Sequence, residues 1–399
     1  MGVEFYKGLV NPALARLDSE TWHNRTKNLL DLLEHTPYGL NLIQQLNFGR
    51  QRFSDERLRV DIDGIRAESP LFVGPGWTKN GEGVRGLIAL GYSGVEVGTV
   101  VLNPQIGNQP LPRQEVIIIN GRVVTWNWLG FNQKETAETI GQRLNQYSDL
   151  VVGGNVGINK DVKAKDAPEA LAKLTRILIP SSDYTRVKFL VLNHSSPNTV
   201  LLDQDTPLRR LLGKEYLMDS AQAIISVMSE KGVFLPFLIK LSPDMSYQEI
   251  DEALVVAIDV GTTGVIMGNT TTDSEIKRKY YDQKVQRKYG ERFLTTGGIA
   301  GDDPDFRQML LEKTAYIYLN FGNKLMVWGA GAVNDAETAY QRIKAGASIL
   351  EVISGNRAVG PTIAGRILRG LIKLMEQDGL THISQAVGVE AREVVSRAA

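Results

Sequence analysis

A unit that recurs along the chain decides its fold, and residues 150–196 contain it in full: LVVGGNVGINKDVKAKDAPEALAKLTRILIPSSDYTRVKFLVLNHSS. A short, continuously apolar run ends in glycine and polar residues, a stretch with helical periodicity follows, and a second apolar run repeats the first. Continuously apolar strands that alternate with helices are typical of a parallel sheet covered by those helices.

Outward from this unit, the same pattern predicts eight strands. They are LFVGPG (71–76), GVEVGTV (94–100), LVVGGNVG (150–157), FLVLNHSS (189–196), FLIKLSP (237–243), GVIMGNT (264–270), LMVWGAGAV (325–333) and ASILEVISG (347–355). Helical stretches lie between them, among them 134–148, 166–178, 247–261 and 335–347. Eight such units favour a closed (β/α)8 TIM barrel of the α/β class. No GxGxxG follows the first strand, which disfavours an open doubly wound sheet.

Two hairpins interrupt the pattern, in residues 58–66 and 116–124. They turn at Asp63-Gly64 and at Asn120-Gly121, dipeptides that tolerate the positive φ angles of a two-residue turn. The second hairpin follows the second strand, on the barrel face where enzymes of this fold carry their chemistry.

Residues 1–53 are predicted to form a small N-terminal helical extension, and residues 54–399 the barrel. Ser19 is the expected cap of a helix that stops at Pro37. Apolar side chains recur at helical spacing in this region: Trp22, Leu29, Leu30 and Leu33, then Leu42, Ile43, Leu46 and Phe48. Two interpretations remain open, a cap packed on the barrel or a surface that meets a membrane or a lipophilic substrate.

The composition excludes several classes of protein. Among 399 residues, Lys plus Arg equals Asp plus Glu, so no overall charge attracts nucleic acid. The chain contains no cysteine and only four scattered histidines, so no metal site is expected. Neither a spanning apolar run nor a signal or transit peptide is evident.

Polar or glycine residues stand at the end of every predicted strand, where a barrel gathers its functional groups. Amides, hydroxyls and two lysines predominate, and carboxylates are scarce, which suits a planar, anionic, carbonyl-rich ligand. The glycines of WGAGAVND, together with SGNRAVGP leading to a helix at Thr362, predict a phosphate site after the last two strands.

Motifs in this order and spacing resemble the dihydroorotate dehydrogenase family. They are VEVGTV with NPQIGN, WLGFNQ, NVGINK, NHSSPNT, IKLSPD, NTT, TGGIAG, GAGAV and AGASILEV. The N-terminal LDSETWH resembles its membrane-associated, quinone-using class 2. The resemblance implies FMN as cofactor and oxidation of dihydroorotate to orotate in pyrimidine (UMP) biosynthesis, with electrons passed to a quinone. It also implies peripheral attachment to the cytoplasmic face of the cell membrane.

The resemblance further implies roles for individual residues. Ser196 is the expected catalytic base, Thr199 a candidate for its proton relay, and Ser195 has no assigned role. Expected substrate contacts are Lys79, Asn127, Asn193, Asn198, Asn269 and Thr270, and expected FMN contacts are Gly76, Thr99, Asn155, Asn193, Lys240, Gly301, Gly331, Ala332 and Ser354. For Lys240, a salt bridge at a strand end is the purely structural alternative.

Four positions depart from the family pattern: Gly268 replaces a threonine, Ala332 a glycine and Ile353 a tyrosine, and an arginine expected shortly after Arg113 is absent. The last two predict altered selectivity for the quinone head group. The basic segment 274–293 is either a solvated helix, a lid or a seat for anionic lipid. Two other functions remain open: an FMN oxidoreductase of the same fold that acts on another planar ring, and a non-catalytic flavin-binding barrel.

Overall fold

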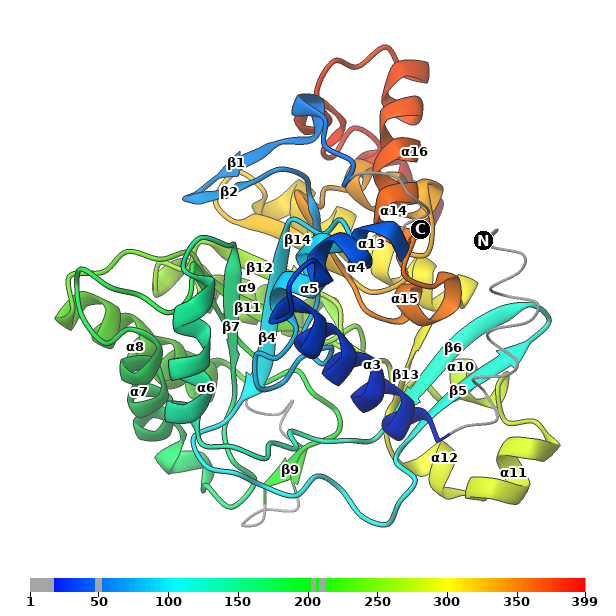
Figure 1. The fold of residues 1–399 in the computed structure, drawn as a ribbon. Coiled ribbons are helices and arrows are strands. Elements are labelled where there is room, and N and C mark those ends of the chain that lie inside the picture. The colour runs from blue at the N-terminus through cyan, green and yellow to red at the C-terminus, as the bar shows by residue number, and fades with distance from the viewer. Residues whose placement is uncertain (1–17, 47–51, 202–205, 208–212, 399) are drawn as a thin grey trace.

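The computed structural model of the protein describes residues 18–46, 52–201, 206–207 and 213–398. At its centre, eight parallel strands close into a barrel in the order in which they occur along the chain (Figure 1). The strands are β3 (Leu71–Val73), β4 (Gly94–Val100), β7 (Val152–Val156), β8 (Phe189–Leu192), β11 (Phe237–Leu241), β12 (Gly264–Met267), β14 (Met326–Ala330) and β15 (Ile349–Val352). All eight predicted strands and the TIM-barrel class are therefore confirmed.

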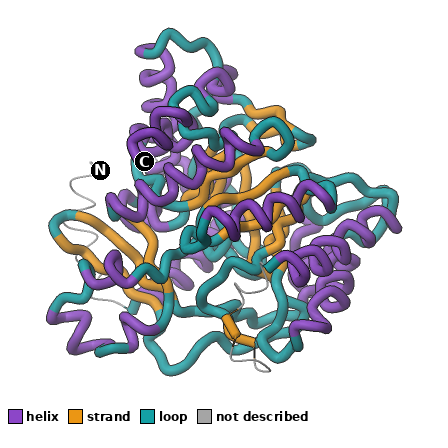
Figure 2. The backbone as a smooth tube through the Cα atoms, turned by 180° about the vertical axis from the view of Figure 1, so that it is seen from behind, coloured by secondary structure: helices purple, strands orange, loops and turns teal. Residues whose placement is uncertain are grey.

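One principal helix follows each strand, and these helices surround the barrel (Figure 2). They are α5 (Val84–Ala89), α6 (Ala137–Leu144), α7 (Ala167–Leu178), α8 (Lys214–Glu230), α9 (Tyr247–Asp259), α13 (Pro304–Phe321), α14 (Ala336–Lys344) and α16 (Ile363–Gln377). Strand β15 is followed first by the short α15 (Ser354–Val359), and α17 (Ala391–Ala398) ends the described chain. Because the helices cover the outer face of the barrel, its strands are buried on both faces, as their apolar runs predict.

Alternate residues of each strand point into the barrel, where aromatic rings fill the lower layers. Phe72, Phe189 and Trp328 contact one another edge to face or tilted, with ring centroids 5.1–6.1 Å apart. Gly94 and Gly153 make room for them, since a Cβ atom at either position would lie within 2.4 Å of a phenylalanine ring. The barrel interior is therefore a packed core and not a pore.

Both predicted hairpins are present, β1 (Val60–Ile62) with β2 (Ile65–Ala67) and β5 (Gln114–Ile119) with β6 (Arg122–Asn127). The turn residues Asp63, Gly64, Asn120 and Gly121 all have positive φ angles. Strand β13 (Gly298–Gly301), which the strand pattern does not predict, pairs antiparallel with β6. The remaining short elements are β9 (Val200–Leu201), β10 (Thr206–Pro207), α10 (Ser274–Arg278), α11 (Gln283–Tyr289), α12 (Arg292–Thr295) and the single 3-10 turns Glu56–Leu58, Asn145–Tyr147, Ala164–Asp166 and Ile383–Ala386.

The N-terminal helices α3 (Ser19–Glu34) and α4 (Gly39–Leu46) pack on α5, and α3 also reaches β5 of the second hairpin (Figure 1). The predicted cap is wrong by one residue. Asp18 and not Ser19 caps α3, because the Asp18 carboxylate accepts a hydrogen bond from the Thr21 N–H at 2.7 Å. The helix ends at Glu34, three residues before Pro37.

Candidate functional site

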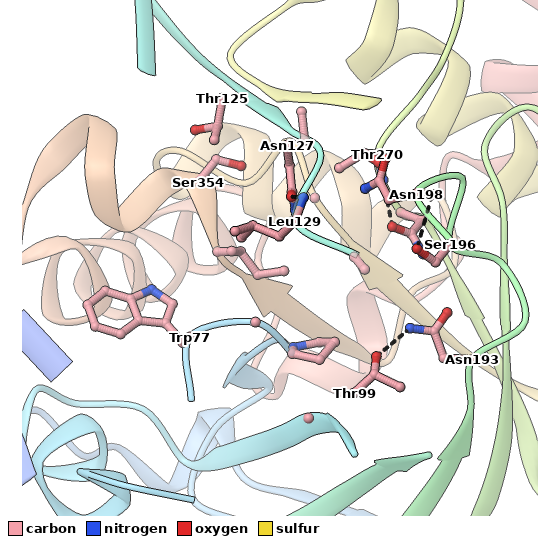
Figure 3. A pocket seen from close by; sticks show the side chains of 18 of the residues that line it. Trp77, Thr99, Thr125, Asn127, Leu129, Asn193, Ser196, Asn198, Thr270 and Ser354 are labelled. Atoms are coloured by element: carbon pink, nitrogen blue, oxygen red, sulfur yellow. Dashed lines mark hydrogen bonds between the residues drawn. The ribbon is translucent and has the colours of Figure 1, made fainter. Parts of the chain in front are cut away.

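One pocket opens at the carboxyl ends of the barrel strands, and hairpin β5–β6 and helix α3 supply the rest of its wall (Figure 3). The predicted site residues that line it are Gly76, Lys79, Thr99, Asn127, Asn193, Ser196, Asn198, Lys240, Asn269, Thr270, Gly331 and Ser354. Asn155, Gly301 and Ala332 do not line it. Residues that are far apart in sequence thus converge because eight parallel strands end around one mouth.

The loop after β8 carries Ser196 into this pocket. The Ser196 side chain is buried, and its Oγ atom accepts a hydrogen bond from the Asn198 N–H at 3.3 Å. The Asn108 amide donates to the Asn198 carbonyl at 2.7 Å, which ties the loop to the segment after β4. Thr199 Oγ1 is buried and has no hydrogen-bond partner in the described part of the chain. The loop therefore presents a hydroxyl whose position is held by the backbone.

A chain of hydrogen bonds fixes the amides around Ser196. Asn193 donates to Thr99 Oγ1 at 2.9 Å and to Asn155 Oδ1 at 3.2 Å. Ser195 Oγ donates to Asn193 Oδ1 at 3.1 Å and accepts from the Asn269 amide at 2.9 Å. Ser195, which has no role assigned from sequence, thus orients two of the predicted ligand contacts. Asn155 belongs to the support behind the pocket.

Further polar atoms of the pocket are available to a ligand. Asn127 Oδ1 accepts from the Leu129 N–H at 2.9 Å, which leaves the Asn127 amide NH2 to donate. Among the described residues, the side-chain oxygens of Thr125, Asn198 and Thr270 are buried without a hydrogen-bond partner. Because a buried polar atom without a partner is costly, these oxygens indicate that the pocket binds a polar ligand.

Lys79 stands at one end of the pocket, and its ammonium donates to the Gly130 carbonyl at 3.2 Å and to the Asn132 side chain. Burial, together with the positive charge of Arg113, lowers the pKa of Lys79 to about 7. This lysine is therefore poised to gain a proton when an anion binds beside it.

Lys240 forms the floor of the pocket at the end of β11. Its Nζ atom lies 2.5 Å from Glu351 Oε2 and 3.7 Å from Glu96 Oε1. The structural alternative for this lysine, a salt bridge, is thus present, and yet the same side chain also lines the pocket. Burial alone would lower the pKa of Lys240, but the two carboxylates outweigh burial and raise it, so the lysine carries its charge.

The departures from the family pattern have local structural reasons. Gly268 has a φ angle of +131°, and a Cβ atom there would lie 2.1 Å from the Ala330 carbonyl oxygen, so this backbone excludes threonine. Ala332 also has a positive φ angle, +56°. Ile353 lines the pocket beside α15. Arg113 does not line it, because its guanidinium pairs with both oxygens of Glu20 in α3, at 2.7 and 2.9 Å.

Four polar side chains that sequence reasoning missed also line the pocket: His23, Gln114, Thr125 and Arg357. His23 Nε2 lies 2.9 Å from the Trp77 carbonyl oxygen and must donate the proton of that hydrogen bond. Burial, and then the charge of Arg357, lower the pKa of His23 to about 3, so its imidazole is neutral. The amphipathic pattern of α3 gave no indication that one of its polar residues reaches a ligand pocket.

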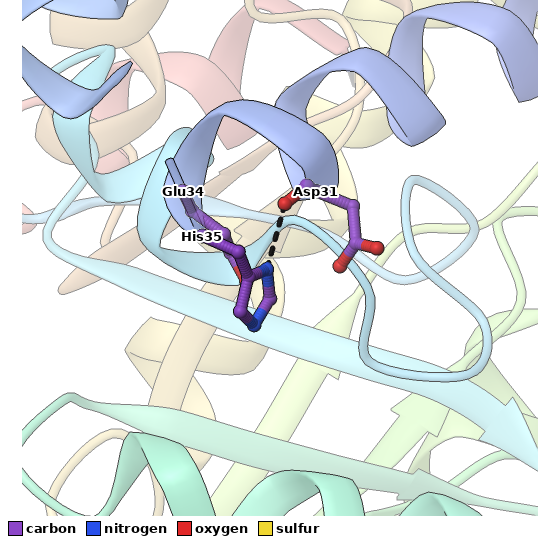
Figure 4. Close-up of side chains that lie close together, drawn as sticks. All are labelled: Asp31, Glu34 and His35. Atoms are coloured by element: carbon purple, nitrogen blue, oxygen red, sulfur yellow. Dashed lines mark hydrogen bonds and ion pairs between the residues drawn. The ribbon is translucent and has the colours of Figure 1, made fainter. Parts of the chain in front are cut away.

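Outside the pocket, Asp31, Glu34 and His35 form a cluster with metal-ligand chemistry (Figure 4). Their hydrogen bonds account for the cluster without a metal. Asp31 accepts from the Gly83 N–H at 3.1 Å and Glu34 from the Gly86 N–H at 3.0 Å, both in the first turn of α5. These carboxylates cap α5 from the neighbouring helix and so fasten α3 to the barrel.

The apolar residues of α3 and α4 divide between two faces. Leu30 and Ile43 are buried against α5, where Gly86 lets them approach closely, whereas Leu29 and Leu42 are about half exposed. The prediction for Phe48 lies outside the described residues. In the part of the chain that the structure describes, no helix is long and apolar enough to cross a bilayer. The packing of Leu30 and Ile43 therefore supports the interpretation as a cap on the barrel, whereas contact of the exposed Leu29 and Leu42 with a membrane stays a prediction.

The basic segment 274–293 folds into α10, α11 and the start of α12, and rings of α11 and α12 contact Trp126 of hairpin β5–β6. Lys288 and Tyr289 both bond to Glu115 of β5. Arg292 donates to the carbonyls of Pro110 and Pro112 at 2.9 and 2.7 Å. The segment therefore braces the wall of the pocket and is not a freely solvated helix, although some of its lysines and arginines remain exposed.

Comparisons with known proteins agree with this geometry. The family model for dihydroorotate dehydrogenase matches residues 57–375. A protein from Natronomonas pharaonis named dihydroorotate dehydrogenase (quinone) is 33% identical over 383 residues, which cover 96% of this chain and 98% of that protein. One of the same name from Thermobifida fusca is 31% identical over 391 residues, with 96% of each chain covered. The crystal structure of DHODH from Eimeria tenella in complex with ferulenol superimposes with a TM-score of 0.75 at 24% identity, over 94% of this chain and 96% of that one, which supports the fold alone.

Proposed function

Because the chain belongs to the dihydroorotate dehydrogenase family, we propose that it oxidises dihydroorotate to orotate in pyrimidine biosynthesis and passes the electrons to a quinone. Its bound cofactor is a flavin, and we propose FMN. The observation that supports this function most directly is the convergence in one pocket of Ser196, four asparagine amides and two lysines.

The residues present fit a flavin. Gly76 and Gly331 line the pocket, and a Cβ atom at Gly76 would meet nothing within 4 Å, so the backbone leaves room for a planar ring. Lys240 would offer a buried positive charge to the carbonyl end of that ring, and Gly331 and Ser354, which line the pocket next to Ala332, would hold the phosphate. When bound there, the flavin supplies the acceptor for the hydride from C6 of dihydroorotate.

We assign the substrate to the part of the pocket nearest Ser196. Asn127, Asn193, Asn198 and Asn269 are neutral groups that both donate and accept, as the alternating N–H and C=O groups of a pyrimidine ring require. The Lys79 ammonium neutralises the carboxylate of the substrate. Since Ser195 holds two of these amides, the ring meets groups that are already oriented.

Ser196 Oγ removes the proton from C5. The Asn198 N–H occupies one lone pair of this oxygen, leaves the other for the incoming proton, and stabilises negative charge as the hydroxyl proton departs. The buried Thr199 hydroxyl is the candidate to receive that hydroxyl proton.

For the acceptor we propose the side of the pocket next to α3. The arginine that is missing from β5 has a counterpart there in Arg357 of α15, a helix that packs against β6 of the same hairpin. Arg357 donates to the Ser19 carbonyl at 2.6 Å and also lines the pocket, so its guanidinium places a fixed positive charge beside the proposed quinone. The exposed Leu29 and Leu42 support peripheral contact of this side with the cytoplasmic face of a membrane.

The holoenzyme tests this function directly. Anaerobic dihydroorotate should bleach the flavin, and a ubiquinone or menaquinone analogue should reoxidise it faster than oxygen does. Arg357→Gln should slow the quinone step and spare the dihydroorotate step, whereas Arg366→Gln, on an exposed part of α16, should spare both. No bleaching by dihydroorotate would overturn the substrate, and no advantage of quinone over oxygen would overturn the acceptor.

Orotate binding should depend on pH through Lys79. The lysine carries its proton below its pKa of about 7, so binding of the anion there requires no proton. Above that pH, binding must first restore the proton, and the affinity for orotate should fall by about tenfold per pH unit. Calorimetry in buffers of different ionisation enthalpy should show proton uptake on binding at pH 8. Uptake that persists unchanged in Lys79→Met would exclude this assignment.

A further inference from the structure

The eight barrel strands carry only three ionisable side chains, and all three lie together. Glu96 of β4, Lys240 of β11 and Glu351 of β15 meet inside the barrel, where both carboxylates contact the ammonium. Strands β3, β7, β8, β12 and β14 contribute none. Both glutamates are fully buried, and Lys240 is the member that reaches the pocket. The glutamates therefore lie beneath the pocket floor, and the function proposed above uses neither of them.

The three charges do not balance. Both carboxylates approach the Lys240 ammonium, at 2.5 and 3.7 Å, and the Asn155 amide donates to Glu96 Oε1. Glu96 Oε2 and Glu351 Oε1 are buried and have no hydrogen-bond partner in the described part of the chain. With both glutamates ionised, the cluster would bury one uncompensated negative charge, which is strongly unfavourable in such a site. One added proton removes that charge.

We propose that Glu96 and Glu351 hold a single proton between them at neutral pH, and that this proton sets the net charge of the pocket floor around Lys240. The proton belongs to the pair, in which two carboxylates share one site. Burial, and then the neighbouring Glu351, raise the pKa of Glu96 well above its usual range, which agrees with this arrangement. The glutamates are positioning residues, since they act on a ligand only through Lys240.

The shared proton affects the binding of a charged ligand above Lys240. The other ionisable side chains that line the pocket are His23, Lys79 and Arg357. As the pH rises through the pKa of the pair, the proton leaves and the floor gains one negative charge. Negative charge on a ligand above Lys240 is then disfavoured. For the flavin, this step rests on the function proposed above. The reduced form of the flavin then becomes thermodynamically less favourable at high pH.

Infrared spectroscopy tests the proton without reference to activity or flavin. The wild-type chain should show the C=O stretch of a protonated carboxyl at neutral pH, and this band should disappear as the pH rises. Either Glu96→Gln or Glu351→Gln should abolish it, because the remaining carboxylate then pairs with Lys240 and ionises. Glu82→Gln is the matched control, because Lys27 at 2.6 Å outweighs burial and lowers the pKa of Glu82 to about 2.

The outcomes are distinct. A wild-type chain without the band, or a band that survives Glu351→Gln, overturns the proposal even if neither variant folds well, because the first measurement needs no variant. For the holoenzyme, the flavin midpoint potential should fall with pH more steeply in the wild type than in Glu351→Gln. If the midpoint potential has the same slope against pH in both proteins and the infrared band is present, the link to the flavin is rejected and the shared proton is retained. Failure of dihydroorotate to reduce the flavin would leave both measurements unaffected.

Discussion

Replacing Ser196 by alanine is expected to slow reduction of the flavin by dihydroorotate about 10²–10⁴-fold, the usual contribution of a positioned general base. The substitution removes one oxygen atom from a loop whose backbone is held elsewhere, by the bond from Asn108 to the Asn198 carbonyl. FMN content and orotate affinity should therefore change little. Stopped-flow absorbance under anaerobic conditions measures the rate, and titration with orotate measures the affinity.

Ser195→Ala is the informative comparison, because the two serines are adjacent and lose the same atom. Ser195 orients Asn193 and Asn269, so its loss should weaken binding of dihydroorotate and orotate and change the maximal reduction rate less. If Ser196→Ala reduces its flavin at the wild-type rate, Ser196 is not the base. If the two variants behave alike, the loop acts only by positioning the substrate.

Replacing Lys240 by methionine is expected to have the second large effect, on both flavin content and stability. The variant leaves two buried carboxylates without their cation, and breaking a buried ion pair in this way costs about 3–5 kcal/mol. The protein should purify with little flavin, because the ring loses its charged partner. Urea unfolding monitored by circular dichroism, together with the ratio of flavin to protein absorbance, provides the two measurements.

A second substitution separates the two effects. In Lys240→Met with Glu351→Gln, one of the unpaired carboxylates is gone, so part of the stability should return while the flavin content stays low. Full flavin occupancy in Lys240→Met would show that the lysine serves only the ion pairs. Unchanged stability would mean that protonation of both glutamates fully compensates for the loss of the ammonium.

Local sequence patterns are sufficient to predict the barrel strands and the hairpin turns of this protein. Continuous apolar runs and helical periodicity predict all eight barrel strands, and two dipeptides with positive φ angles predict both hairpin turns. These features depend on residues that are neighbours along the chain, whose spacing decides which face each side chain occupies. The residues at the strand ends follow from the same reasoning, because closure of a parallel barrel brings those ends together wherever they lie in the sequence.

The other features of the fold and of the site depend on contacts between segments that are distant in sequence. Ser195 has a role because it bonds to Asn269, and His23 lines the pocket because α3 crosses the edge of the pocket. Strand β13 forms by pairing with β6. Glu96, Lys240 and Glu351 stand on three separate strands, and nothing within any one of those strands shows that two carboxylates will face one ammonium. The protonation of such a group depends on burial and on charges supplied across the barrel, which arise only when the chain has folded.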